Sequence, residues 1–257
     1  GSLFATATTL NHFQYEDQGN GTGALKLNLG DIKFENHESY KKIKYANTGQ
    51  LFEIGMPDLP TFSSLYMVDK NVEYNVEYQI NNSYSIENIE LMPYFENNNK
   101  KQILKGSQLN LDSYSQIESY PSNQMNIGEP KTFRDINVIS VEFIPFKYFP
   151  NERRLEVYND VDITITPQST ITDNSNIQYS RPFVKMYESL IPNFTRTEGM
   201  EFQQPAILFI GGGSSLDNSH VEDLIEWRHK QGYVIYTAST SQTGTNSNNI
   251  QNYIEDV

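Results

Sequence analysis

The run Gly211-Gly212-Gly213-Ser214-Ser215 contains the residue types of this sequence that could most directly do chemistry. It follows the apolar run AILFI and precedes a segment with helical spacing, and backbone amides at the start of a helix can bind phosphate. The run matches neither G-x-G-x-x-G nor the Walker pattern, and no lysine follows at the Walker position. It also lacks the G-x-S-x-G spacing of a serine nucleophile. The sequence therefore favours a plain turn.

Metal-ligand spacing is also absent from the titratable residues. The four histidines are His12, His37, His220 and His229. The last two would lie about 180° apart on one helix, so they face opposite sides. Acidic pairs such as Glu16-Asp17 offer oxygen ligands of the kind calcium takes, but no compact D-x-D-x-D-G loop is present. We expect solvated turns and surface histidines, and we assign no metal ligand in this chain.

Cysteine does not occur among the 257 residues. Disulfides, thiolate metal sites and a cysteine nucleophile are therefore excluded in this chain. With no serine motif either, the sequence offers no catalytic constellation, so we predict no catalytic residue here. Any enzymatic activity of the parent protein must depend on residues elsewhere.

Charge narrows the range of partners. Nineteen Lys and Arg face 32 Asp and Glu, which gives a net charge of -13. Such a chain repels nucleic acid and anionic lipid, so a basic protein surface is the better partner. No apolar run approaches the roughly 18 residues that span a bilayer. The acidic balance and the abundance of Asn, Ser and Tyr favour a secreted or cell-surface bacterial protein. Three glycosylation sequons, at Asn20, Asn81 and Asn193, mean little in such a chain.

Elements with period-two alternation dominate from Ala24 to Thr166. Residues 66–80, YMVDKNVEYNVEYQI, predict one half-buried strand. Residues 154–166, RLEVYNDVDITIT, alternate in the same way on both sides of the turn residues Asn159 and Asp160. Many strands without a convincing helix among them predict an antiparallel β-sandwich or barrel.

After Thr166 the pattern changes to a polar linker and then to helical signals. Residues 183–194 predict a short helix that Pro192 stops. Ser219 with Glu222 forms a capping box, and Gly232 stands where that helix would end. An apolar strand lies on each side, which predicts a parallel βαβ unit followed by a last helix near the end of the sequence. We expect a β-sandwich domain over 1–198 and an incomplete α/β segment over 199–257.

Four stretches of the chain resemble the N-terminal region of gingipain-type cysteine peptidases, meaning their propeptide and the start of their catalytic domain. The first is a Gly-x-Pro-x-Leu-Pro stretch that runs into a strand, the second is a strand pair around a Pro-Phe-x-Tyr-x-Pro turn, the third closes the propeptide, and the fourth begins the catalytic domain. They are residues 55–68, 134–166, 179–194 and 205–236. Their order and spacing over about 180 residues make the resemblance specific.

The resemblance implies a β-sandwich propeptide that keeps a peptidase latent, assists its folding and is removed by proteolysis, often after a basic residue. It implies a caspase-like catalytic domain with a His and Cys pair beyond Val257, and calcium bound in that domain. The expected partner is the chain's own or an associated peptidase domain, and no cofactor is expected in this segment.

Within that frame, an exposed basic side chain near the domain junction would occupy an acidic specificity pocket, because a guanidinium binds carboxylates in a bidentate way. Arg196 in NFTRTEG is the processing or inhibitory candidate, followed by Arg181 and Lys185. Arg153-Arg154 is expected at a hairpin tip.

Two other readings stay open at this point. The chain could be an adhesin-like or carbohydrate-binding β module with an α/β appendage, for which a patch of exposed aromatic residues would speak. It could also come from a sortase-like peptidase of a bacterial secretion system with the same catalytic fold.

Overall fold

A computed structural model describes residues 12–37, 39–94, 117–169 and 177–256. The chain divides into two compact units. The first contains residues up to Asn176 together with Val184–Glu198, and the second contains Ile177–Phe183 together with Gly199–Val257.

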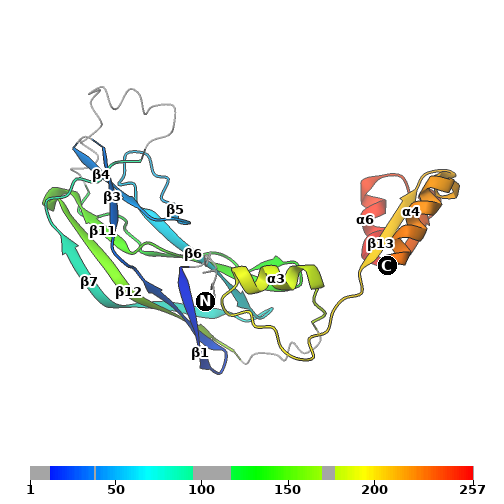
Figure 1. Cartoon of the computed structure of the whole chain (residues 1–257), viewed down its shortest axis with the longest axis horizontal. Helices are drawn as coiled ribbons and strands as arrows, with labels where there is room; N and C mark the ends of the chain where they lie inside the picture. Colours follow the sequence, from blue (N-terminus) through cyan, green and yellow to red (C-terminus); the bar gives the residue numbers. More distant parts are fainter. Residues whose placement is uncertain (1–11, 38, 95–116, 170–176, 257) are drawn as a thin grey trace, which may run out of the picture. The chain divides into compact units, whose positions relative to one another are not determined.

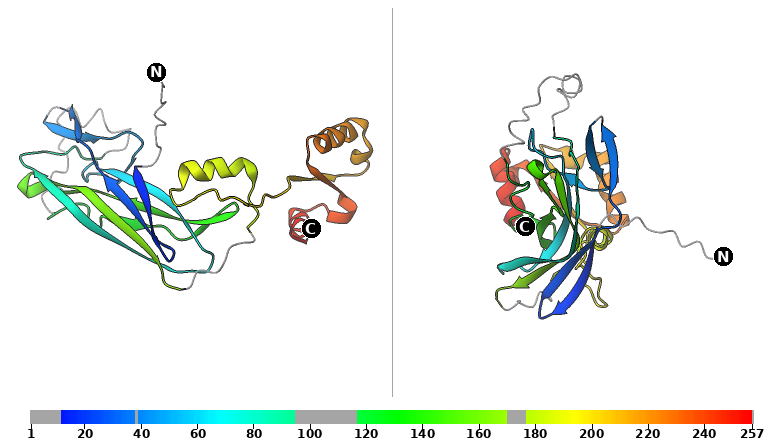
Figure 2. Two further views of the ribbon diagram at one scale, coloured as in Figure 1. Left: turned by 60° about the horizontal axis from the view of Figure 1, so that its bottom comes forward. Right: turned by 90° about the vertical axis from the view of Figure 1, so that its left-hand side faces the viewer.

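The first unit is a sandwich of two antiparallel sheets (Figures 1 and 2). One sheet has the order β1-β2-β12-β11, with β7 also paired to β12. The strands of this sheet are β1 (Phe13–Gly19), β2 (Thr22–Asn28), β7 (Tyr74–Ile86), β11 (Phe146–Phe149) and β12 (Arg154–Pro167). Strand β12 is its centre, because β7 follows nearly its whole length while β2 and β11 share its opposite edge.

The second sheet has the order β5-β6-β10-β8, and β9 also pairs with β10. Its strands are β5 (Gly49–Gln50), β6 (Pro60–Val68), β8 (Met125–Ile127), β9 (Lys131–Phe133) and β10 (Ile136–Phe143). A separate hairpin joins β3 (Lys33–His37) to β4 (Tyr40–Lys44). The expected antiparallel β-sandwich is therefore confirmed.

Alternation in the sequence produces the core between these sheets, because successive side chains of a strand point to opposite faces. Along β12 the inward residues are fully buried: Leu155, Val157, Val161, Ile163 and Ile165. They share one core with aromatic residues of both sheets, and the ring of Phe62 in β6 lies 6.5 Å from that of Phe146 in β11, centroid to centroid. Burying this row of aliphatic and aromatic side chains is the main stabilisation of the unit.

Two details of the strand prediction were wrong. Residues 66–80 are not one strand, since β6 ends at Val68 and β7 begins at Tyr74, with a left-handed residue, Asn71, in the turn between them. Asn159 and Asp160 are not a turn, since β12 runs through them and its register with β7 shifts there, which is a β-bulge. Polar residues are common both in turns and in β-bulges, because both interrupt the regular hydrogen bonding between strands.

The second unit contains the parallel βαβ arrangement that the sequence predicts. Strand β13 (Ala206–Gly211) pairs in parallel with β14 (Val234–Ser239), and helix α4 (Ser219–Lys230) connects them after the short helix η2 (Ser215–Asp217). Helices α5 (Thr240–Thr243) and α6 (Ser247–Asp256) follow.

The boundaries of α4 are set by its caps. Asn218, not Ser219, is the N-cap, because its side chain accepts a hydrogen bond from the amide of His220. The predicted capping box of Ser219 and Glu222 was therefore wrong, because the N-cap lies one residue earlier and Val221 stands at the third helical position. At the other end Gly232 has a φ of 91°, a conformation that glycine adopts without steric cost. No residue of α4 is fully buried, and Trp227 is 51% exposed.

Candidate functional site

The stretch from helix α3 to Glu198 carries the basic residues that the sequence marks for processing. Helix α3 (Arg181–Leu190) begins with Pro182 in its first turn, where a missing N–H costs nothing. Its inward residues, Val184 and Tyr187, are three apart and buried, and Pro192 follows the last turn. The short helix predicted before Pro192 is confirmed, and its amphipathic spacing explains which face is covered.

Tyr187 anchors the helix in the first unit. Its ring contacts Phe133 and Phe194 edge-on, with centroids 5.8 and 5.3 Å away. Its hydroxyl donates to a carboxylate oxygen of Asp135 at 3.2 Å. Burial raises the pKa of Tyr187, so the phenol stays neutral and remains a donor. The contact therefore joins α3 to the β9–β10 turn by both packing and a hydrogen bond to a charged group.

Asn193 fixes the chain just after the helix. The N–H of Met67 donates to Asn193 Oδ1, and Asn193 Nδ2 donates to the carbonyl oxygen of Met67, both at 2.8 Å. A primary amide can satisfy both main-chain groups of one residue, as a neighbouring strand would. Asn193 thus caps β6 on the side opposite β10, and Phe194 beside it is buried.

Immediately after Phe194 the chain becomes exposed. Thr195, Arg196, Thr197 and Glu198 form an irregular connector, and every one of them is exposed. Limited proteolysis requires an accessible, irregular backbone, and this segment is both exposed and irregular. A protease can therefore bind it. The geometry therefore places Arg196 in exposed chain, three residues after Asn193, whose side chain is bound to β6.

The two other basic candidates lie elsewhere on this stretch. Lys185 is exposed on the outer face of α3 in the first unit. Arg181 belongs to the second unit, where its guanidinium lies over the ring of Phe202 at 4.7 Å from the centroid. All three candidates are thus exposed.

The comparisons with known proteins bear on this junction. The model of the family described as Propeptide_C25 matches residues 24–195, about two thirds of the chain. The chain belongs to this propeptide family. The matched region covers the sandwich, helix α3 and Asn193, and it ends one residue before Arg196.

Relatives of the propeptide point the same way. Gingipain R1 of Porphyromonas gingivalis is 22% identical over 249 residues, which is 90% of this chain and 24% of the relative. Gingipain R2 of the same species is 21% identical over 152 residues, 56% of this chain and 20% of the relative. The chain therefore spans about a quarter or less of the length of these curated relatives.

Two solved structures share the fold of the propeptide. One is the complex of Porphyromonas gingivalis RgpB pro- and mature domains, with 14% identity, a TM-score of 0.57, and coverage of 72% of this chain and 98% of that chain. The other concerns zymogenic latency of gingipain K from the same species, with 15% identity, a TM-score of 0.50, and coverage of 64% and 96%. At these identities the likeness establishes the fold alone.

The arginine pair Arg153-Arg154 of the propeptide does lie at a hairpin tip, between β11 and β12 next to the short helix η1 (Pro150–Glu152). Arg153 has a φ of 50° and forms an ion pair with Glu90 at 3.2 Å. Arg154 stacks 3.8 Å above the Phe149 ring and bonds Glu152 at 2.7 Å. Both guanidinium groups therefore have partners in the first unit, Glu152 at the tip and Glu90 outside it, which favours a structural role for the pair.

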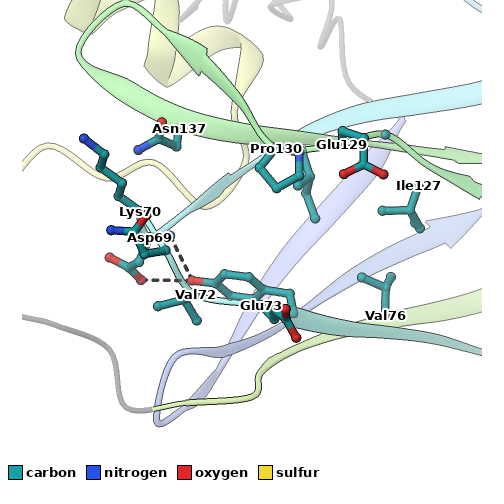
Figure 3. Close-up of a pocket in the computed structure, with 13 residues that line it drawn as sticks. Asp69, Lys70, Val72, Glu73, Val76, Ile127, Glu129, Pro130 and Asn137 are labelled. Atoms are coloured by element: carbon teal, nitrogen blue, oxygen red, sulfur yellow. Dashed lines mark hydrogen bonds between the residues drawn. The ribbon is translucent and has the colours of Figure 1, made fainter.

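A groove of the propeptide opens between the β6–β7 turn and the β8–β9 turn (Figure 3). Two residues that line it are bonded to each other, since the Tyr74 hydroxyl donates to the Asp69 carboxylate and accepts from the Asp69 N–H, each at 2.9 Å. Burial, as the largest cause, raises the pKa of Tyr74 to about 12. Its other charged side chains, Lys70, Glu73 and Glu129, are of mixed sign, and the groove contains no nucleophile next to a base.

The glycine run of the second unit has a packing reason. A Cβ on Gly211 would run into the side chain of Leu216, and Gly213 has a φ of 57°. The turn between β13 and η2 thus needs glycine for close approach and for backbone conformation. Among the residues that the structure describes, no three His, Asp or Glu side chains gather to hold a metal ion.

One functional residue escaped the sequence prediction. Asn193 stood out only as a sequon, yet its amide is the anchor that precedes the connector. Its partner Met67 is 126 residues away in the sequence, so no local pattern could have indicated the contact.

Proposed function

We propose that this chain is the latency and folding module of a secreted cysteine endopeptidase, joined to the first part of its catalytic domain. Residues 1–198 would form the propeptide, and residues 199–257 would begin the α/β catalytic domain. The observation that carries the proposal is the family match over 24–195 together with a sandwich similar to gingipain propeptides. The parallel strands β13 and β14 with helix α4 between them are the kind of layer that opens an α/β domain.

Arg196 is the processing residue in this proposal. Three observations support it: the family match ends at Thr195, Asn193 holds the preceding chain on β6, and the connector is exposed. An arginine in an exposed, irregular segment can enter an acidic pocket, where its guanidinium forms paired charge-assisted hydrogen bonds with a carboxylate. Arg181 and Lys185 both lie on the regular helix α3, whose backbone must unwind before a protease can cleave it.

Catalysis would belong to residues beyond Val257, because the chain has no cysteine. Calcium, where it is bound, would be held by that catalytic domain. The partner of the sandwich would be that same peptidase domain. We further propose that the parent protein is exported or surface-located and bacterial, as its relatives' organism suggests. None of the described helices is long and apolar enough to cross a bilayer.

The adhesin and sortase readings lose support from the family match, since neither accounts for a propeptide model that spans the sandwich. The aromatic residues also speak against a sugar platform. The aromatic side chains of Phe62, Phe143, Phe146 and Tyr148 are fully buried in the core of the sandwich and cannot stack on a sugar.

The test is processing of the full-length precursor in wild-type, Arg196→Ala and Arg196→Lys forms. We expect the wild type to be cut after Arg196, as the N-terminal sequence of the mature fragment would show, and Arg196→Ala to slow this cut at least tenfold. Lys185→Ala serves as the matched control and should be processed normally. Cleavage of Arg196→Ala at the usual position and rate would exclude Arg196 as the processing residue.

A further inference from the structure

The path of the chain around the connector has an unusual order. It passes from the first unit to the second after Asn176, returns after Phe183, and leaves again after Glu198. Residues 177–183 and 199–203 therefore belong to the same unit, although α3 and the connector separate them in sequence. A single cut within Thr195–Glu198 breaks only the last of these three covalent connections between the units.

Specific contacts join the two segments of the second unit. The N–H of Tyr179 donates to the carbonyl oxygen of Glu201, and the N–H of Gln203 donates to the carbonyl oxygen of Tyr179, both at 2.9 Å. This reciprocal pair is a parallel bridge between Tyr179 and Phe202. The side chain of Gln203 adds a hydrogen bond to the carbonyl oxygen of Gln178 at 2.7 Å.

Arg181 completes the set. Its guanidinium lies over the Phe202 ring, 4.7 Å from the centroid, which is within the range of a cation–π contact. We call residues 177–183 and 201–203 together the clasp. Its contacts use main-chain groups, one amide side chain and one cation–ring pair, so they do not depend on the connector being intact.

The first unit holds the other end of the same stretch. Val184 and Tyr187 of α3 are buried there, and Asn193 binds the main chain of Met67. After a cut at Arg196, residues 184–196 would stay on the sandwich through these contacts. Residues 177–183 lie on the same covalent fragment, because they precede the cut.

We propose that the clasp keeps the two fragments associated after the connector is cut, with residues 177–183 acting as a strap that the amino-terminal fragment extends onto the carboxy-terminal one. In this assignment Arg181 is a docking residue of the strap and Phe202 is its receiving surface. Cleavage and release then become separate steps: release requires the strap to peel away from Glu201, Phe202 and Gln203. The significance for zymogen processing rests on the proposed function, but the clasp itself does not.

The experiment uses the whole chain with a recognition sequence for an unrelated site-specific endopeptidase inserted between Arg196 and Thr197. An added enzyme makes the cut, so the result is independent of whether the chain belongs to a peptidase precursor. Amide hydrogen exchange of Tyr179 and Gln203 is measured before and after cutting, together with size-exclusion elution of the fragments. We expect both amides to stay protected and the two fragments to elute together.

Variants separate the clasp from any other association. The double variant Arg181→Ala with Phe202→Ala should keep its fold, because Arg181 is exposed and Phe202 only partly buried, and far-ultraviolet circular dichroism of the uncut chain checks this. Loss of one exposed cation–π contact should raise the exchange rate of both amides and the separation rate of the fragments by roughly fivefold. Lys185→Ala, on the outer face of α3, should change neither rate.

Two outcomes would overturn the proposal. In the first, the cut wild-type chain separates at once and the amides of Tyr179 and Gln203 exchange as in unstructured chain. In the second, the fragments stay together equally well in the double variant, so that another surface holds them.

Discussion

The side-chain amide of Asn193 binds both main-chain groups of Met67, with two hydrogen bonds of 2.8 Å. This contact joins the segment that follows helix α3 to strand β6 and fixes where the exposed connector begins. It makes the position of Arg196 a consequence of packing in the sandwich rather than of the connector's own sequence.

Asn193→Ala should therefore lower the free energy of unfolding by about 1–3 kcal/mol, because it leaves the donor and acceptor of Met67 without their partner. Asn193→Asp should also destabilise the protein, because a carboxylate can accept from the Met67 N–H but cannot donate to its carbonyl oxygen. Urea unfolding measures both. Asn75→Ala is the control, at an exposed asparagine whose side chain donates to the Glu77 carboxylate, and its free energy of unfolding should stay within about 0.5 kcal/mol of wild type. Equal stability of Asn193→Ala and wild type would show that the hydrogen bonds between Asn193 and Met67 do not stabilise the protein.

The Gly-x-Pro-x-Leu-Pro stretch is stabilised by an ion pair. Asp58 is buried, accepts from Lys42 Nζ at 2.5 Å and from the side-chain amide of Gln50, and donates its own N–H to the carbonyl oxygen of Met92. Asp58→Ala should lower the free energy of unfolding by about 3–5 kcal/mol, because it leaves the partly buried ammonium group of Lys42 without its counter-charge.

The matched control for this ion pair is Glu16→Ala. Glu16 pairs with Lys26 at 2.6 Å, but both side chains are largely exposed, at 54% and 43%. Water screens such a pair, so its loss should cost less than about 1 kcal/mol. A similar cost for Asp58→Ala and Glu16→Ala in thermal or urea unfolding would show that burial does not strengthen the Asp58 pair.

Alkaline pH should destabilise the sandwich through its buried tyrosines. Burial, aided by Glu156, raises the pKa of Tyr158 to about 12, and burial raises that of Tyr74 to about 12. The unfolded phenol titrates near pH 10, so the folded state holds these protons more tightly than the unfolded state does. This stabilisation is complete below about pH 10 and is lost as the pH rises towards 12.

Phenolate absorbance during a pH titration measures this directly. We expect some tyrosines to titrate near pH 12, and fewer of them to do so in Tyr158→Phe. The free energy of unfolding should decline between about pH 10 and pH 12. If every tyrosine of the folded protein titrated near pH 10, the burial of these hydroxyl groups would be contradicted.

The sequence allowed much of this fold to be predicted, for reasons that particular residues make clear. Alternation along 154–166 identified the core face of β12, because side-chain direction in a strand depends only on position. It could not separate a turn from a bulge at Asn159-Asp160, since that depends on hydrogen bonds to β7. The N-cap of α4 was misplaced by one residue, because Asn218 and Ser219 are both good capping residues and only the backbone angles decide between them.

The site was less predictable than the fold. Arg196 could be singled out because it is basic and lies in a polar stretch, and the structure adds that this stretch is exposed. The anchor Asn193 and the clasp between Tyr179 and Phe202 could not be foreseen, because each joins residues that only the tertiary structure brings together.

The central claim is that the sandwich restrains a cysteine peptidase, and inhibition of that enzyme by the isolated residues 1–198 tests it most directly. The proposed peptidase domain of the parent protein would be purified in mature form, and its cleavage of a basic peptide substrate would be followed while residues 1–198 are added. We predict that activity falls to near zero at about equimolar ratio and that Arg196→Ala inhibits less tightly. Full activity in the presence of a large excess of folded residues 1–198 would contradict the account.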